Sequence, residues 1–181
     1  GQLTINDTTG GVIDFKGDKC FVVDGTSAKA TLESGKVLCN DKQGYAFYAK
    51  NGGTAVINGG TVESLYSPLS GNNTTGNMNF EVNGGTITAK YGPAIYMPGQ
   101  GKLKITAGTI NGGISLRMGH VDISGGTINA VTSDIDSPSE YYSYSGNAWF
   151  PDALYVFGGT YTSAAGNDLV LNITGGTFNC A

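Results

Sequence analysis

The most constraining feature of this 181-residue sequence is a short string that recurs along it with a glycine step at its centre. The clearest copy is AVINGGTVES, residues 55–64. The other copies are ATLESGKVLC (30–39), FEVNGGTITA (80–89), LKITAGTING (103–112), VDISGGTINA (121–130) and LNITGGTFNC (171–180), with a partial copy, ALYVFGGTYTS, at 153–163. Internal periods of about 20–50 residues indicate a solenoid, a propeller or an array. The repeat therefore takes precedence over any local pattern.

Alignment of the copies on the second glycine of the step places apolar residues at fixed positions on both sides of it. Five residues before the glycine stand Ala30, Ala55, Phe80, Leu103, Val121, Leu154 and Leu171. Three before it stand Leu32, Ile57, Val82, Ile105, Ile123, Val156 and Ile173. Two after it stand Val37, Val62, Ile87, Ile110, Ile128, Tyr161 and Phe178. Because the positions between are mostly polar, each copy is predicted to be two short strands that meet at a glycine corner.

A second recurring string supplies a third strand to each repeat. Its copies are GYAFYA (44–49), GPAIYM (92–97) and DALYVF (152–157), with KCFVV (19–23) and GGISLRM (112–118) as looser relatives. The shortest spacing between aligned glycines is 17 residues, from 159 to 176, which leaves little room for a helix. Like residues would then stack from turn to turn, about 4.8 Å apart. We predict an all-β fold, a parallel β-helix solenoid of about seven coils with one inserted loop.

Other repeat architectures fit less well. The consensus of a leucine-rich repeat is absent, and a propeller blade needs about 40–50 residues. Glycine accounts for 30 residues, and charged residues make up 13%, about half the usual share of ~25%. We expect one domain, residues 1–181, as a segment of a larger protein, with an irregular first coil over 1–29 and a polar loop over 66–79.

The segment 132–152, TSDIDSPSEYYSYSGNAWFPD, interrupts the period and is the main candidate for a functional site. Insertions in repeat proteins map to loops on one face, often the binding face. Aromatic rings beside carboxylates suit a sugar or a protein surface, although they could equally fold back over the coils as a lid. Acids of the loop could also form the carboxylate pair of a glycosidase or bind calcium. The candidate ligand-binding residues are Tyr141, Tyr142, Tyr144, Trp149, Phe150, Asp134, Asp136, Glu140 and Asp152, together with Tyr96 and Tyr155 outside the loop.

Three further features favour an ordinary structural role. A T-x-T/N ladder after the glycines resembles the hydroxyl rows of ice-binding β-helices, but threonine is also a good strand residue. The single histidine, His120, lies near Arg117 and is expected at a surface bend. Cys20, Cys39 and Cys180 are expected to be small inward thiols, since their number is odd and their spacing suits neither disulfides nor zinc. We expect no cofactor and no metal.

Charge and hydropathy limit the partners. The net charge of −4, without a basic patch, argues against nucleic acid. No apolar run approaches about 18 residues, so we expect no insertion into a membrane. The exposed ends of the coil could pair end to end.

The strings VINGGTVES, EVNGGTITA, DISGGTINA and NITGGTFNC resemble the right-handed β-helix repeats of bacterial surface and secreted proteins. Those proteins are often described as adhesin-like or carbohydrate-binding and share the fold of pectate lyases. The resemblance covers about residues 30–181 and implies a right-handed coil on an extracellular or cell-surface bacterial protein. The chain departs from the lyase pattern because it lacks an evident calcium-site acid cluster with a nearby catalytic Lys or Arg.

Three functions are compatible with these observations, because a fold does not determine a function. The first is an extracellular, non-catalytic adhesion module that recognises a glycan or a host surface protein through the 132–152 loop. The second is a structural stalk of a bacterial surface protein. The third is a polysaccharide lyase or glycoside hydrolase that uses the loop acids. We expect the first, which favours a non-catalytic role and leaves enzymatic activity undecided.

Overall fold

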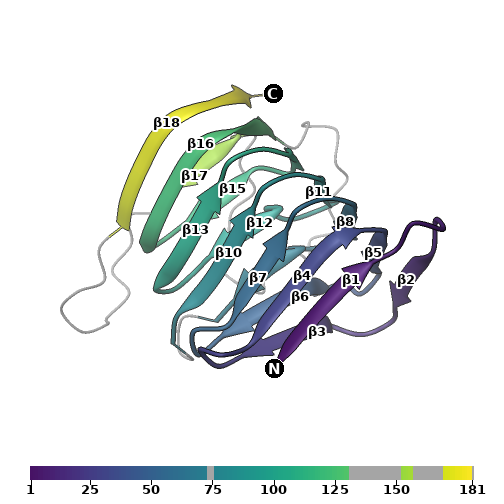
Figure 1. The fold of residues 1–181 in the computed structure, drawn as a ribbon. Helices are drawn as coiled ribbons and strands as arrows, with labels where there is room; N and C mark the ends of the chain where they lie inside the picture. Colours follow the sequence, from purple (N-terminus) through teal and green to yellow (C-terminus); the bar gives the residue numbers. More distant parts are fainter. Residues whose placement is uncertain (73–75, 131–151, 157–168, 181) are drawn as a thin grey trace.

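The computed structural model describes residues 1–72, 76–130, 152–156 and 169–180. Within these ranges the chain forms strands and turns without a helix, and the strands pair in parallel. The strands succeed one another as turns of a coil, from the first at one end to β18 at the other (Figure 1). The predicted all-β parallel β-helix is confirmed.

Each turn contributes one strand to each of three faces, which we name in chain order. The first face consists of β1 (Gln2–Asn6), β4 (Lys29–Ser34), β7 (Thr54–Ile57), β10 (Met78–Val82), β13 (Gly101–Ile105) and the beginning of β16 (Gly119–Asn129). The second face consists of β2 (Val12–Phe15), β5 (Lys36–Cys39), β8 (Thr61–Ser64), β11 (Thr86–Ala89), β14 (Thr109–Asn111) and the end of β16. The third face consists of β3 (Lys19–Asp24), β6 (Tyr45–Lys50), β9 (Leu69–Gly71), β12 (Ile95–Met97), β15 (Ile114–Leu116) and β17 (Leu154–Val156).

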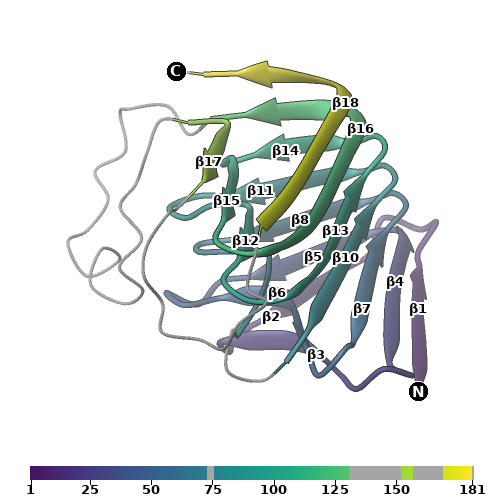
Figure 2. The same ribbon diagram turned by 90° about the vertical axis from the view of Figure 1, so that its left-hand side faces the viewer.

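The long strands β16 and β18 (Leu169–Asn179) run without a break from the first face onto the second, and they pair with each other over both. Figure 2 shows the coil from the end that carries β18. The chain runs up the first face, across the second and down the third, counterclockwise as successive turns approach the viewer. The coil is therefore right-handed.

The interior is built from rows of equivalent side chains, as the alignment predicts. In the six complete copies, each glycine-aligned apolar position follows the parallel register from one turn to the next. Ile57, Val82 and Ile105, for example, are successive register partners, and none is exposed. Burial of such side chains contributes about 1.5–3 kcal/mol each relative to an exposed position. The rows are therefore the main stabilising feature of the coil.

The glycine steps lie where the first face turns into the second. Gly60 has a φ of +72°, and a Cβ built there would lie 2.5 Å from the carbonyl oxygen of Gly35 in the preceding turn. Any side chain at Gly60 would meet both an unfavourable backbone conformation and this oxygen. The close stacking of the corners thus explains why a glycine recurs at the same point of each repeat.

Two sequence predictions are wrong in detail. Leu154 and Val156 were placed in the interior rows of the glycine-aligned strands, but they lie in β17 and pair with Ile114 and Leu116 on the third face. They belong with the second recurring string, which covers the same residues. The glycine step of this partial copy lies outside the described residues.

The predicted polar loop at 66–79 is also wrong in part. Tyr66, Ser67 and Leu69 are buried, and β9 continues the third face through this segment. The Ser67 hydroxyl donates to the carbonyl oxygen of Pro93 at 2.8 Å, so a polar residue is accommodated beneath the next turn. Residues 73–75 of this segment lie outside the described residues.

Exposed large apolar side chains occur only at the two ends of the described coil. Those at the first end lie in β1, β2 and β3, and those at the other end lie in β17 and β18. They are Leu3, Val12, Ile13, Phe15, Val22, Val156, Val170 and Ile173. Among the described residues, the strands that carry them have a neighbouring turn on one side only.

Candidate functional site

Most of the residues predicted to bind a ligand lie outside the described residues. These are Tyr141, Tyr142, Tyr144, Trp149, Phe150, Asp134, Asp136 and Glu140. Their assignment to a binding loop stays a prediction. Tyr96, Tyr155 and Asp152 are described.

Tyr96 and Tyr155 lie in one outward row of the third face. Tyr96 pairs with Ser115, and Ser115 pairs with Tyr155 in the next turn. Asp152 is half-buried two residues before β17, with its carbonyl oxygen close to Gly113. The structure therefore brings the two predicted tyrosines onto the same face, with Asp152 at the start of the same strand segment.

Tyrosines are frequent on this face, but several of them are covered. Tyr48, Tyr66 and Tyr96 are 9%, 4% and 6% exposed, although they lie outside the interior apolar cluster. The rings of Tyr45 and Tyr66 are in edge-to-face contact, with centroids 5.9 Å apart, and burial raises the pKa of Tyr45. The guanidinium of Arg117 lies 5.5 Å from the ring centre of Tyr96. These rings stabilise one another and the face beneath them.

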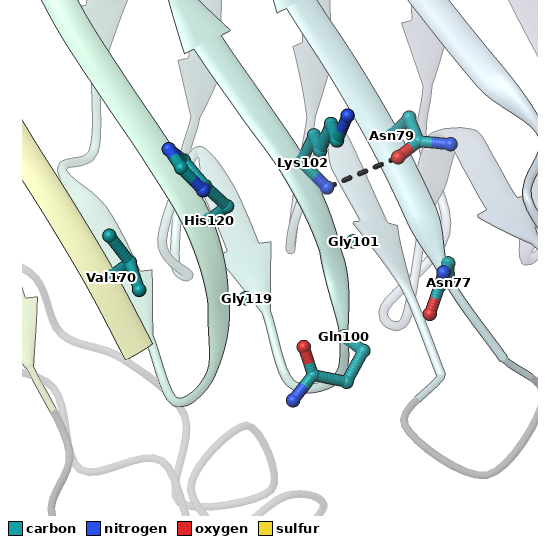
Figure 3. Close-up of a pocket in the computed structure, with 8 residues that line it drawn as sticks. All are labelled: Asn77, Asn79, Gln100, Gly101, Lys102, Gly119, His120 and Val170. Atoms are coloured by element: carbon teal, nitrogen blue, oxygen red, sulfur yellow. Dashed lines mark hydrogen bonds between the residues drawn. The ribbon is translucent and has the colours of Figure 1, made fainter. Parts of the chain in front are cut away.

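An open polar hollow lies on the first face, where the turns from the third face enter β10, β13 and β16 (Figure 3). Its volume is about 340 Å³. The side chains of Asn79, Lys102 and His120 stand on the outer side of three adjacent strands. Its described lining consists of Asn77, Asn79, Gln100, Gly101, Lys102, Gly119, His120 and Val170.

The parallel register places Lys102 directly beside His120. The side-chain oxygen of Asn79 accepts a hydrogen bond from the backbone N–H of Lys102 at 3.1 Å, and its amide nitrogen donates to the carbonyl oxygen of Gly52 at 3.0 Å. These contacts fix the Asn79 side chain on the strand. At Gly119, φ is +103° and a Cβ would lie 2.9 Å from the carbonyl oxygen of Gly101, so the floor of the hollow stays free of side chains.

His120 lies within β16, not at the predicted surface bend, because β16 begins at Gly119, two residues before the repeat string that begins at Val121, and His120 already pairs with Lys102 of β13. Its Nε2 lies 3.3 Å from Oδ1 of Asp122. The hydrogen bond that Asn172 donates at 2.9 Å lowers the pKa of Asp122 below its usual range, and His120 and Lys104 lower it further. Asp122 thus holds one nitrogen of the imidazole beside the hollow.

The T-x-T/N ladder of the second face is a regular outward array. Thr61, Thr86 and Thr109 follow one another in register. In the neighbouring row the amide of Asn129 donates to the Asn111 side-chain oxygen at 2.7 Å and accepts from Asn179 at the same distance. These hydrogen bonds satisfy polar groups of adjacent turns, as expected for ordinary strand surface.

The three cysteines are free. Cys39 is buried in the interior cluster, and Cys20 packs against that cluster, as the small-inward prediction requires. Cys180 follows β18 and is exposed. No group of three His, Cys, Asp or Glu side chains that could hold a metal ion occurs in the part of the chain that the structure describes.

The hollow was missed because the sequence comparison concentrated on the apolar columns. Its key residues occupy the column six positions before each aligned glycine, which contains Lys29, Thr54, Asn79, Lys102, His120 and Val170. The change along this column from Asn79 to Lys102 and His120 was the one feature of the sequence that could have indicated a polar site at this position. The depth of the hollow depends on turns that differ in length from coil to coil, and no column of the alignment contains that information.

The hollow offers hydrogen-bond donors to a ligand that approaches from one side. Lys102 supplies an ammonium group, His120 a ring nitrogen, and the asparagines and Gln100 amides. A glycosidase needs two carboxyl groups about 5–9.5 Å apart. No carboxylate belongs to the described lining of the hollow. The arrangement suits binding of a polar molecule.

No described helix is long and apolar enough to cross a membrane. Comparison with known proteins gives no match to a protein-family model, to a curated protein or to a solved structure.

Proposed function

We propose that this chain is a non-catalytic binding module of an extracellular bacterial surface protein, and that it holds a glycan in the hollow of the first face. The observation that supports this most is the convergence of amide, ammonium and imidazole groups from three register-paired strands on one open hollow. Binding sites carry a few polar groups that fix the orientation of the ligand, and rigid strands hold such groups in place. The extracellular bacterial setting is taken from the resemblance of the repeats.

An open hollow fits a glycan better than it fits a small enclosed ligand. Sugar hydroxyls can accept hydrogen bonds from Lys102, His120 and the amides of the lining, while a longer chain extends over the neighbouring strands. The outward row that includes the hollow continues to Thr54 on one side and to Val170, a lining residue, on the other. These positions lie along the coil axis, so an extended chain could contact several turns.

A glycan array tests the proposal. The wild-type chain should bind a limited set of glycans, and a Lys102→Ala/His120→Ala double variant should lose those signals, because both donors of the hollow are removed. The matched control is Lys29→Ala/Thr54→Ala, which changes the same row of the first face outside the hollow. Absence of any glycan signal from the wild-type chain would overturn the proposal.

The same array separates the hollow from the 132–152 loop. A Trp149→Ala/Tyr142→Ala double variant removes two of the aromatic residues predicted in that loop. Loss of signal in this variant alone would assign binding to the loop, and loss in the hollow variant alone would assign it to the hollow. Unchanged signals in both variants would refute both assignments.

A structural stalk is the second candidate function. It is supported by the uninterrupted interior rows and by the exposed apolar side chains at both ends of the described coil, which further turns could cover. A stalk would need no ligand. It would bind no glycan on the array, and replacement of the hollow residues would not change the distance at which it holds its neighbouring domains.

A further inference from the structure

The charged residues at the hollow differ in sign from the chain as a whole. The chain has a formal net charge of −4, whereas the titratable side chains in the described lining of the hollow are Lys102 and His120. General solubility does not account for a cationic side chain at this hollow, since lysines elsewhere on the surface serve solubility without lining a hollow. The positive charge at the hollow therefore favours a ligand that carries a negative charge.

Lys102 differs in its surroundings from four other lysines of the described coil. Lys36 pairs with Glu63 at 3.0 Å and Lys50 with Asp24 at 3.0 Å, while Lys16 pairs with Asp14 and Lys19 with Asp18. The register partners of Lys102 are Asn79 and His120, and neither is a carboxylate. Lys102 lines the hollow, and its ammonium group makes no ion pair with the described residues.

Lys104 provides an internal comparison on the same strand. It lies two residues beyond Lys102 on the same outer side, but its register partners are Glu81 and Asp122. Its charge is therefore offset by a carboxylate on each neighbouring strand. Two lysines of similar exposure on one strand thus differ in whether a charge of the protein compensates them.

His120 is the second donor at the hollow. Its Nε2 lies 3.3 Å from Oδ1 of Asp122, and the same carboxylate accepts a hydrogen bond from Asn172 at 2.9 Å. Lys102 and His120 are direct partners on adjacent strands, about 4.8 Å apart in the hydrogen-bonding direction. That spacing allows two donors to contact the oxygens of a single anionic group.

We infer that the hollow selects glycans that carry an oxyanion, and that Lys102 and His120 bind that group together. This inference rests on the proposed function, because it names the class of glycan that the same hollow takes. The oxyanion is either a carboxylate or a sulfate ester, since both present two or more oxygens to paired donors. The amides of the hollow contact the neutral hydroxyls of the same ligand.

Isothermal titration calorimetry with chemically matched polysaccharides tests the inference. The probes are chondroitin sulfate, chondroitin without sulfate, sulfated chondroitin with its carboxyl groups reduced, and a neutral form lacking both groups. The acidic forms should bind at least about tenfold more tightly than the neutral form, as expected for loss of a charge-assisted hydrogen bond. The two singly charged forms distinguish a carboxylate from a sulfate as the group that is bound.

Charge-neutral variants assign the effect to residues. Lys102→Gln should weaken binding of the acidic forms by about tenfold and leave the neutral form unchanged. Lys104→Gln and Lys29→Gln are matched controls that remove one positive charge from the same face outside the hollow, and they should leave affinity within about twofold. Unchanged circular dichroism and melting temperature would show that each variant is folded.

The outcomes separate this inference from the proposed function. Equal binding of neutral and acidic forms would overturn the inference and leave glycan binding in place. Equal losses in Lys102→Gln, Lys104→Gln and Lys29→Gln would also overturn it, because they would show attraction to general surface charge. Absence of binding to these probes and to every glycan on the array would overturn the proposed function itself.

Discussion

At the scale of single residues, tolerance to substitution at the corners depends on the carbonyl oxygens of the preceding turn. A Cβ at Gly84 would collide with the carbonyl oxygen of Asn58, although the φ of Gly84 is not in the left-handed region. Gly10 has a φ of +85° but has no atom within 4 Å of a Cβ placed there. Substitution of these two glycines therefore distinguishes the effect of steric crowding on stability from the effect of backbone conformation.

We predict that Gly84→Ala lowers the free energy of unfolding more than Gly10→Ala does. Gly10→Ala should cost about 1–2 kcal/mol, the usual penalty for a side chain in the left-handed region. Gly84→Ala should exceed this, because the strands of neighbouring turns must move apart. Chemical denaturation of both variants measures the difference, and a smaller loss for Gly84→Ala would contradict the close stacking of corners.

The thiol of Cys20 gives a prediction about pH. Burial, with a smaller contribution from Cys39, raises its pKa to about 12. A raised pKa in the folded state favours the protonated thiol, so this contribution to stability is present below the pKa of an unfolded thiol, about 8.5, and is lost as the pH rises toward 12. Only the thiolate is nucleophilic.

At pH 8 we therefore expect iodoacetamide to modify the exposed Cys180 first and to modify Cys20 and the buried Cys39 slowly. Peptide mass spectrometry after timed alkylation measures the three rates. The denatured protein is the control, since all three thiols should then react alike. Equal rates for Cys20 and Cys180 in the folded protein would show that Cys20 is not inside the coil.

At the scale of strands, the amide row of the second face should stabilise the stacking of β14, β16 and β18. Asn129 donates to Asn111 and accepts from Asn179, each at 2.7 Å. Asn129→Ala should lower the free energy of unfolding by about 1–2 kcal/mol, because one hydrogen bond is lost on each side. Thr127→Ala, at the adjacent outward position of the same strand, is the matched control and should cost less.

The strands also show what could be predicted from the sequence. The interior rows through Ile57 and Ile87 followed from the alternation of apolar and polar residues, since burial imposes this period on every coil. β9 was missed because its strand, Leu69–Gly71, is short and lies among Ser, Pro and Asn, which favour turns. Its neighbours in the adjacent turns, rather than its own sequence, hold it in the third face.

The candidate site was less predictable for a related reason. Lys102 and His120 are neighbours only because the coil places residues 18 positions apart in register. Tyr96 and Tyr155 were predicted to bind a ligand outside the loop, which stays a prediction, and the 6% exposure of Tyr96 depends on packing that the sequence pattern does not describe. Burial in the interior is repeated in every coil, whereas a binding site arises where coils differ.

At the scale of the whole molecule, the ends of the coil differ from its middle. Ile13 and Ile173 are 38% and 47% exposed, whereas Ile57 in a central turn is fully buried. Strands with an unpaired edge and exposed apolar side chains tend to associate. We predict that the average mass of the chain in sedimentation velocity rises with concentration, and that an Ile13→Lys/Ile173→Lys variant stays monomeric over the same range. Concentration-independent mass for the wild-type chain would contradict end-to-end pairing.

The central claim is that equivalent side chains of successive turns form continuous interior rows around which the outward faces are built. Methyl-labelled nuclear magnetic resonance tests it most directly, because nuclear Overhauser effects report methyl groups in contact. The claim predicts cross-peaks from Ile57 to Val82, from Val82 to Ile105 and from Ile105 to Ile123, which are register partners in adjacent turns. Absence of these cross-peaks in the folded protein would contradict the coil, and with it the hollow formed by Lys102 and His120.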